Sequence, residues 1–380
     1  MATKSTVSKP KRRGVFMVWD RRVRTRAVRE RDVVLVTGSS GFIGAPFIRK
    51  LASSYAMVGF DRAGDPHPPV EAECVCVDLT DDQSVEAGLA RVRYAYGDRL
   101  ASVVHLAAYY DFSGAPNPKY EQVTVQGTRR LLDALQTFTV EQFVFSSTLL
   151  VHRPASPGQR IDERTPLDPA WPYPQSKVDT ERTISEHHGD IPTVLLRIAG
   201  VYDDMGHAPP LANQIRRIWE RRFSSHLFPA SPRTVTPYLH IADLVDAMVA
   251  VVDRRHELPE EVAILLGEDD APAFAELQDL IGLALHGRSW RTQRVPRWLA
   301  AGGAWLQDRV PFGGDPFVKP WMVERTADHY ALDTSRARIL LGWRAKRSLR
   351  DTVPIIATAL EDDPEGWYRA NGFDPERATR

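Results

Sequence analysis

The stretch VVLVTGSSGFIGAPFIRKL, residues 33–51, joins an apolar run, a glycine-rich turn and a helical pattern. The run at 33–36 predicts a buried strand, and Gly38, Gly41 and Gly44 follow it at three-residue intervals. In this spacing the first glycine permits a tight turn, the second lets the backbone approach a pyrophosphate, and the third lets the helix pack closely. The pyrophosphate would lie at the positive N-terminus of the helix. The stretch therefore predicts a dinucleotide-binding strand–turn–helix unit.

Short apolar runs alternate with helical patterns through the first half of the chain. This alternation predicts an α/β fold of Rossmann type, a doubly wound parallel sheet with helices on both faces. Strands buried on both faces are continuously apolar, as these runs are. The expected strands are 33–36, 56–60, 74–77, 102–106, 142–145 and 193–196, and the helical patterns between them include 45–53, 125–137 and 176–188.

The regular alternation of apolar runs and helical patterns ends after about residue 203. The rest of the chain is mostly helical, with patterns at 274–285, 296–307, 334–341 and 349–360. We expect residues 32–205 to form the NAD(P)-binding core, to which 234–266 returns. Residues 206–233 and 267–361 should form a smaller, interleaved substrate-binding lobe. Residues 1–31 are expected to be a basic, flexible tail and 362–380 a C-terminal tail.

Charge is unevenly distributed along a chain whose formal net charge is zero. Residues 1–31 hold eleven Lys/Arg and two Asp/Glu, a net charge of +9, so the remainder carries −9. The overall balance argues against a nucleic-acid-binding protein, although the basic tail leaves a contact with a membrane or a nucleic acid open. The six-residue apolar run 14–19 is too short for a signal-peptide core or a membrane span.

The chain has two cysteines, Cys74 and Cys76, on one expected strand. Side chains two residues apart on a strand share a face, which is a poor geometry for a disulfide, and two thiols are too few for a structural zinc site. We expect reduced cysteines in a cytoplasmic protein and no metal centre.

The second expected strand leads into Asp61, 23 residues after Gly38. This is close to the roughly 20 residues that separate a glycine loop from the acid that binds the adenosine ribose. A carboxylate there repels the 2′-phosphate of NADP, whereas Arg62 would attract it. The sequence favours NAD over NADP.

The segment WPYPQSK, residues 171–177, places Tyr173 four residues before Lys177. Pro174 is tolerated only in the first turn of a helix, so Tyr173 lies at the start of one, and positions i and i+4 share a face. Free tyrosine has a pKa near 10, and we expect Lys177 and a positive nicotinamide to lower it. Tyr173 would then exchange the proton of a carbinol or carbonyl oxygen, with Thr148, or Ser147 beside it, orienting that oxygen.

Six motifs occur in a familiar order: TGSSGFIG (37–44), HLAA (105–108), VFSST (144–148), YPQSK (173–177), HIAD (240–243) and LDTSRARILLGW (332–343). Over roughly residues 32–360 the chain resembles an extended short-chain dehydrogenase/reductase of the NAD-dependent epimerase/dehydratase family. It is also similar to 3β-hydroxysteroid dehydrogenase-like and dihydroflavonol-reductase-like members. The resemblance implies an oxidoreductase or epimerase and, because paired helices often form dimers in this fold, a homodimer.

By this resemblance the catalytic residues are Thr148, Tyr173 and Lys177. His105 and His240 are placement residues without a catalytic role. The residues implied to contact the cofactor are Gly38, Gly41, Phe42, Ile43, Gly44, Asp61, Arg62, Asp78, Leu79, Ala107, Tyr173 and Lys177.

Three departures from the family bear on the substrate. Leu149 and Leu150 follow Thr148 where sugar-nucleotide dehydratases carry an Asp–Glu pair, which argues against a dehydratase. The segment LRIAGVYDD (196–204) lacks the Asn that nucleotide-sugar enzymes use, and Thr124 replaces a second Asn.

The substrate class stays open at this point, and so does the choice between an epimerase and a dehydrogenase. Arg216, Arg221, Arg222 and Arg233 are available for a diphosphate, whereas aromatic residues favour a partly apolar substrate. These aromatic residues are Tyr109, Tyr110, Phe112, Trp298 and Trp305. The rival class is a non-catalytic NAD(P)-binding sensor or scaffold, but such proteins tend to lose the Tyr or Lys that is present here.

Overall fold

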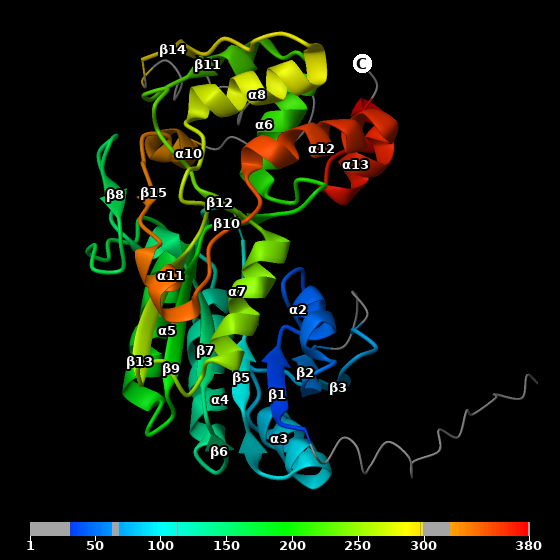
Figure 1. Ribbon diagram of the computed structural model, residues 1–380, viewed down its shortest axis with the longest axis vertical. Helices are drawn as coiled ribbons and strands as arrows, with labels where there is room; N and C mark the ends of the chain where they lie inside the picture. The colour runs from blue at the N-terminus through cyan, green and yellow to red at the C-terminus, as the bar shows by residue number, and fades with distance from the viewer. Residues whose placement is uncertain (1–30, 63–67, 112, 297, 299–319, 379–380) are drawn as a thin grey trace, which may run out of the picture.

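The protein, described here as a computed structural model, is built on a seven-stranded parallel sheet in the order β13-β9-β7-β5-β1-β2-β3 (Figure 1). The structure describes residues 31–62, 68–111, 113–296, 298 and 320–378. The α/β prediction of Rossmann type is confirmed, and each of the six expected strands is found. The strands are β1 (Val33–Thr37), β2 (Ala56–Asp61), β3 (Glu73–Cys76), β5 (Ser102–His105), β7 (Phe143–Thr148), β9 (Thr193–Ile198) and β13 (Glu261–Leu266).

Helices cover both faces of the sheet because each strand carries apolar side chains on both sides. One apolar cluster joins the sheet to α2 (Gly44–Leu51), α7 (Ile241–Asp253) and α11 (Ser335–Leu341). A second cluster joins the opposite face to α3 (Asp82–Tyr96), α4 (Gln126–Leu135) and α5 (Pro172–His187). A π-helix, η1 (Tyr120–Val125), precedes α4.

A second lobe has its own apolar core and lies beyond the carboxyl ends of the strands (Figure 1). The chain enters it after β9, returns as α7 and β13, and enters it again. Its main elements are α6 (Pro209–Trp219), α8 (Phe274–His286), α12 (Leu349–Asp362), α13 (Pro364–Ala370), β11 (Leu227–Phe228) and β14 (Gln293–Arg294). Between the lobes β10 (Gly200–Tyr202) pairs with β12 (Tyr238–His240).

The C-terminal segment differs from the expected tail. Residues 364–370 form α13, and the side chains of Trp367 and Tyr368 are fully buried in the core of the second lobe. The sequence shows only a short amphipathic stretch after Pro364, and the partner surface that buries it comes from α6 and α12. The expected helix at 296–307 falls almost entirely outside the described residues.

Short elements complete the fold. They are β4 (Arg99–Leu100), β6 (Thr139–Val140), β8 (Arg160–Ile161), β15 (Ala331–Leu332), α10 (Pro320–Arg325), and the single turns η2 (Leu149–Val151), η3 (Phe223–His226) and η4 (Pro375–Arg377). Cys74 and Cys76 lie on the edge strand β3 and are both free thiols. Within the described ranges, none of the helices has the length and apolar character needed to cross a bilayer.

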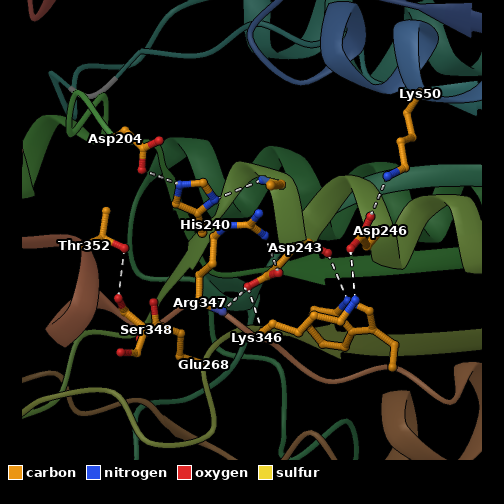
Figure 2. A network of polar contacts seen from close by, with 12 residues as sticks. Lys50, Asp204, His240, Asp243, Asp246, Glu268, Lys346, Arg347, Ser348 and Thr352 are labelled. Atoms are coloured by element: carbon orange, nitrogen blue, oxygen red, sulfur yellow. Dashed lines mark hydrogen bonds and ion pairs between the residues drawn. The ribbon is translucent and has the colours of Figure 1, made fainter. Parts of the chain in front are cut away.

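A buried carboxylate connects the two lobes (Figure 2). Asp243, in the first turn of α7, accepts hydrogen bonds from the backbone N–H groups of Lys346 (2.9 Å) and Arg347 (2.7 Å) and from the Arg347 guanidinium (3.1 Å). The indole of Trp343 donates to the backbone carbonyl of Asp243 at 3.0 Å. The motifs HIAD and LDTSRARILLGW therefore meet here, and their contacts hold the linker between α11 and α12 against α7.

Candidate active site

The glycine loop turns sharply after β1. Gly38 has φ +67°, and a Cβ on it would lie 3.0 Å from the backbone nitrogen of Ala107. A Cβ on Gly44 would lie 2.3 Å from the carbonyl oxygen of Gly38, which no real contact permits. The first glycine is thus required by backbone conformation, and the third by the close approach of α2 to the loop itself.

The start of α2 is open to an anion. Ile43, at the N-cap, makes no capping hydrogen bond through its side chain, and the first turn carries no acidic residue. A helix N-terminus has unpaired N–H groups and a positive dipole end, so a diphosphate fits this place. Gly41, Phe42 and Ile43 are partly or fully exposed at the loop surface.

Asp61 lies beside this loop at the end of β2. Its carboxylate accepts hydrogen bonds from the backbone N–H of Ser40 (2.8 Å) and of Arg62 (2.9 Å). The side chain remains partly exposed, and the Arg62 side chain is exposed. Asp61 is therefore fixed next to the candidate pyrophosphate site, where its remaining lone pairs suit ribose hydroxyls.

Asp78 and Leu79, the next two residues implied to contact the cofactor, follow β3. Asp78 accepts hydrogen bonds from the backbone N–H and the hydroxyl of Thr80 at 2.9 and 2.8 Å, and these bonds lower the pKa of its exposed carboxyl. Leu79 is buried against the start of α4, where a Cβ on Gly127 would lie 3.1 Å from the Leu79 Cβ. Asp78 thus shapes a turn, and Leu79 supports α4.

His105 connects the glycine loop to β5 and α4. Its ring nitrogens contact the Thr37 hydroxyl at 2.7 Å and the Thr128 hydroxyl at 2.9 Å, and the Thr37 hydroxyl also accepts the backbone N–H of Ala107 at 3.1 Å. Complete burial lowers the pKa of His105 to about 3, so the ring is neutral at pH 7. This geometry agrees with a placement role.

The expected acid/base residues come together at the carboxyl end of β7. Helix α5 begins at Pro172, so Tyr173 lies in its first turn. A side-chain hydrogen bond joins Tyr173 to Thr148, the last residue of β7. Lys177, 3% exposed, donates to the backbone carbonyl of Ser146 at 2.7 Å, and its Nζ lies 6.0 Å from the centre of the Tyr173 ring.

The electrostatics of this pair differ from the sequence expectation. Burial raises the pKa of Tyr173 above its ordinary value, and the hydrogen bond with Thr148 only partly opposes this effect. Burial also lowers the pKa of Lys177 to about 7, opposed by the negative charge of Glu181. Desolvation is the largest cause of both shifts, so the side chains alone keep Tyr173 protonated and suited to donate a proton.

Ser147 has a different partner from Thr148. Its hydroxyl donates to Glu181 at 2.5 Å, and Glu181 forms a buried ion pair with Arg197. Thr148 is thus the hydroxyl that faces Tyr173. Sequence reasoning missed Glu181, although its position four residues after Lys177 placed it on the same face of the helix.

Thr124, the substitute for a family Asn, is fully buried in η1. Its hydroxyl accepts the backbone N–H of Tyr109 at 2.9 Å and so holds the loop that follows β5. π-helical turns are frequent at functional sites.

Aromatic rings surround Tyr173. Tyr110 packs edge-on against it, with ring centres 5.1 Å apart at 90°, and Trp171 lies 5.4 Å away on another side. Tyr110 keeps 53% of its surface exposed, so it borders the open side of the site. Of the other expected aromatic residues, Trp298 is 75% exposed, while Phe112 and Trp305 lie outside the described residues.

Two of the four arginines proposed for a diphosphate form ion pairs within the second lobe. Arg216 bonds to Asn213 at 2.9 Å and shares Glu220 with Arg222 in two ion pairs. Arg221 has a strained φ of +52°, and the backbone N–H of Arg233 donates to the Ser231 hydroxyl at 3.2 Å. Within the described ranges, His, Cys, Asp and Glu form no group of three that could hold a metal.

The comparison with protein families decides the assignment. The model described as "NAD dependent epimerase/dehydratase family" matches residues 34–267. The chain belongs to this family. Its cofactor is NAD, and the residues present fit that group: the open N-terminus of α2, the close-packed glycine loop and the carboxylate of Asp61.

Two curated relatives represent different chemistries within the family. Human 3 beta-hydroxysteroid dehydrogenase type 7 is 30% identical over 229 residues. The match covers 53% of this chain and 58% of the relative, which is less than two thirds of the relative's length. UDP-glucose 4-epimerase of Rhizobium leguminosarum bv. trifolii is 28% identical over 357 residues, covering 85% of this chain and 95% of the relative. Both relatives are named as enzymes, which supports the inference that this chain is an enzyme.

Solved structures agree in fold. UDP-glucose 4-epimerase of Thermus thermophilus, in complex with NAD, superposes with a TM-score of 0.64 at 22% identity, covering 87% of this chain and 99% of that one. UDP-glucuronic acid 4-epimerase of Bacillus cereus, in complex with NAD, gives a TM-score of 0.62 at 20% identity, covering 87% and 99%. At this identity the likeness concerns the fold alone.

Proposed function

We propose that this member of the NAD dependent epimerase/dehydratase family interconverts a secondary alcohol and a ketone, with Tyr173 as the acid/base. The observation that carries the proposal is the hydrogen bond between Tyr173 and Thr148 at the carboxyl end of β7. Open α/β sheets bind ligands beyond this edge, and the glycine loop lies at the same edge. A hydroxyl pair there can hold one substrate oxygen between two hydrogen-bonding groups.

Each residue has a distinct task in this proposal. When bound, NAD accepts or returns the hydride of the carbinol carbon. In ketone reduction the Tyr173 hydroxyl donates its proton to the carbonyl oxygen while the Thr148 hydroxyl orients that oxygen. In alcohol oxidation Tyr173 must accept the proton, and Lys177, when protonated, favours the phenolate required for this. Lys177 also binds the cofactor ribose in this proposal.

We favour a partly apolar hydroxy or keto substrate. Tyr110 and Trp171 form an aromatic border next to Tyr173, and two of the four arginines available for a diphosphate, Arg216 and Arg222, are engaged in ion pairs with Glu220. The 3 beta-hydroxysteroid dehydrogenase relative is named for a substrate of this kind.

A nucleotide-sugar epimerase is the second candidate. The match to UDP-glucose 4-epimerase spans 95% of that relative, whereas the match to the 3 beta-hydroxysteroid dehydrogenase spans 58% of that one. In that case NAD would stay bound between oxidation and reduction. A dehydratase is disfavoured because Leu149 and Leu150 cannot move a proton. A cytoplasmic location and a homodimer remain predictions.

The test begins with thermal stability of the purified protein in saturating NAD, with UDP, GDP, dTDP and CDP added in turn. A ligand at 100 times its dissociation constant stabilises by about 2.7 kcal/mol, which is readily measured. A shift with one nucleotide supports the epimerase. A shift with NAD alone directs the search to apolar alcohols, which are then screened for NAD reduction.

Tyr173→Phe separates catalysis from binding. We expect it to lower turnover by about 10²-fold or more, since general acid/base groups contribute about 10²–10⁴-fold, while the NAD-induced thermal shift persists. Undiminished turnover would reject Tyr173 as the acid/base. NAD binding without turnover of any alcohol, ketone or nucleotide sugar by the wild-type chain would favour the sensor or scaffold.

A further inference from the structure

Three side chains of α5 at four-residue spacing bond to the last three residues of β7. Tyr173 bonds to the Thr148 hydroxyl, and Lys177 bonds to the Ser146 carbonyl at 2.7 Å. Glu181, the third, accepts the Ser147 hydroxyl at 2.5 Å. Only the first two belong to the proposed chemistry, so Glu181 is a buried acid whose role the proposed function does not explain.

Glu181 is also the point at which α5 contacts β9. Both of its oxygens bind the Arg197 guanidinium, at 3.1 and 2.7 Å, and the two side chains are 6% and 8% exposed. Arg197 stands directly opposite Ser147 in the β7–β9 register. Arg197 also contacts the His152 ring at 3.2 Å and the backbone carbonyl of Glu163 at 3.3 Å. The carboxylate is therefore held by two strands at once.

The charge of Glu181 acts on Lys177 because both lie on one face of α5 and are shielded from water. It is the one charged group that raises the pKa of Lys177, and it opposes the effect of burial. Burial keeps His105 neutral, and it lowers the pKa of His152 to about 4. The titratable groups that face the Lys177–Glu181 pair are Tyr173 on α5, His105 on β5, His152 after η2 and Arg197 on β9.

We propose that Glu181 is a positioning residue for Tyr173 and Lys177: it anchors α5 on β7 and β9 and supplies the negative charge that faces Lys177. This inference rests on the proposed function, since the charge of Lys177 matters to turnover only if Tyr173 is the acid/base. Without Glu181, the protonated form of Lys177 is less stable, and α5 loses its third contact with β7.

Three variants separate charge from packing. Glu181→Gln keeps the size and an acceptor for Ser147 but removes the charge. Glu181→Asp keeps the charge. The double variant Glu181→Gln/Arg197→Met removes both charges, so that no guanidinium is left buried and unpaired if the single variant fails to fold. Arg197 carries the opposite charge next to Glu181, so the double variant should move the Lys177 midpoint less than Glu181→Gln does.

The first readout is the protonation of Lys177 itself. It is followed as a function of pH by NMR of protein carrying ¹³C at the lysine Cε, with Lys177→Met assigning the signal and with no substrate present. We expect the midpoint to move to lower pH by roughly one unit in Glu181→Gln, to move less in the double variant, and to stay in place in Glu181→Asp. An unchanged midpoint in both charge-removing variants overturns the proposal.

The second readout is the pH profile of turnover in the oxidative direction. Activity that needs protonated Lys177 is lost as the pH rises through the pKa of Lys177, so the high-pH limb of the profile should move to lower pH together with the Lys177 midpoint. Above the midpoint, kcat should fall about ten-fold for a one-unit shift. If kcat instead falls by the same factor at every pH and the high-pH limb does not move, Glu181 acts through packing alone. That result would contradict a role for its charge.

Glu141→Gln is the matched control. Glu141 pairs with Arg255 at 2.6 Å with 10% and 9% exposure, comparable to the Glu181 pair, but it lies before the opposite end of β7. It should lower thermal stability without moving the Lys177 midpoint, and a midpoint that moves here too counts against a specific role for Glu181. If wild-type protein turns over no alcohol or ketone yet shows a Glu181-dependent midpoint, the proposed function fails while the charge link is supported.

Discussion

Lys177 donates a 2.7 Å hydrogen bond to the backbone carbonyl of Ser146, and its Nζ lies 6.0 Å from the centre of the Tyr173 ring. A buried ammonium needs an acceptor, and the strand end provides one beside the candidate acid/base. The bond fixes Lys177 between β7 and α5, where burial lowers its pKa to about 7.

This buried lysine should make stability depend on pH. The pKa of Lys177 falls from 10.5 in the unfolded chain to about 7 in the folded one. Between these values the unfolded state binds more protons, so the free energy of unfolding rises with pH, by at most roughly 1.4 kcal/mol per pH unit for one group. Lys177→Met should remove this rise. Urea unfolding of both proteins without NAD, from pH 6 to 10, measures it, and parallel curves would contradict it.

Asp61 should decide between the two nicotinamide cofactors. Asp61→Ala removes the acceptor of the Ser40 N–H and the charge that repels a 2′-phosphate, and it leaves Arg62 free to pair with that phosphate. We expect NAD affinity to fall about ten-fold and the NADP-to-NAD affinity ratio to rise. Titration calorimetry with both cofactors measures this ratio. Asp78→Ala is the control, since Asp78 shapes its own turn, and an equal change in the ratio there would count against Asp61.

Gly44 should tolerate no side chain. A Cβ would lie 2.3 Å from the Gly38 carbonyl oxygen, so Gly44→Ala must displace the loop and α2. A forced backbone shift costs about 1–3 kcal/mol, and NAD binding should be lost with it. Gly41→Ala, whose Cβ would lie 3.2 Å from the same atom, should keep more stability. Thermal melts of both variants and of the wild type, with and without NAD, measure the losses of stability and of NAD binding. Equal melting temperatures for Gly44→Ala and wild type would refute the close packing of Gly44.

Thr148 should be the hydroxyl that orients the substrate. Thr148→Val removes the bond to Tyr173 at nearly constant volume, and kcat should fall about 10²-fold, with Thr148→Ser restoring much of it. Ser147→Ala breaks the bond to Glu181 and should have the smaller effect. Steady-state kinetics of these variants, with the alcohol that the wild-type protein turns over fastest, measure both effects. The reverse order of effects would transfer the role to Ser147.

Tyr110 should contribute to substrate binding rather than to the chemical step. Because 53% of its surface is exposed beside Tyr173, Tyr110→Ala should raise KM for a large apolar alcohol about ten-fold and leave a short-chain alcohol unaffected. Tyr94→Ala, an 84% exposed tyrosine on α3, is the control. A KM for the large alcohol that stays at the wild-type value would remove Tyr110 from the substrate site.

The sequence by itself determined the α/β fold and the family. Continuous apolar runs, period-3.6 patterns, glycine spacing and the Tyr-x-x-x-Lys pair are local properties, readable because each depends on residues within one or two elements. It therefore predicted the strands, the glycine loop, Asp61 and the three residues at the β7–α5 junction.

Only the tertiary structure decided which of these side chains are free for chemistry. The bond between Ser147 and Glu181 and the burial of α13 depend on partners distant in the chain. The ion pairs of Arg216 and Arg222 with Glu220 are local, but the helical pattern alone did not show that these arginines are engaged. The pKa values of Tyr173 and Lys177 likewise follow from desolvation, which packing imposes and no local pattern encodes. Short-range patterns specify the elements of this protein, whereas the environment of each ionisable group arises when those elements pack together.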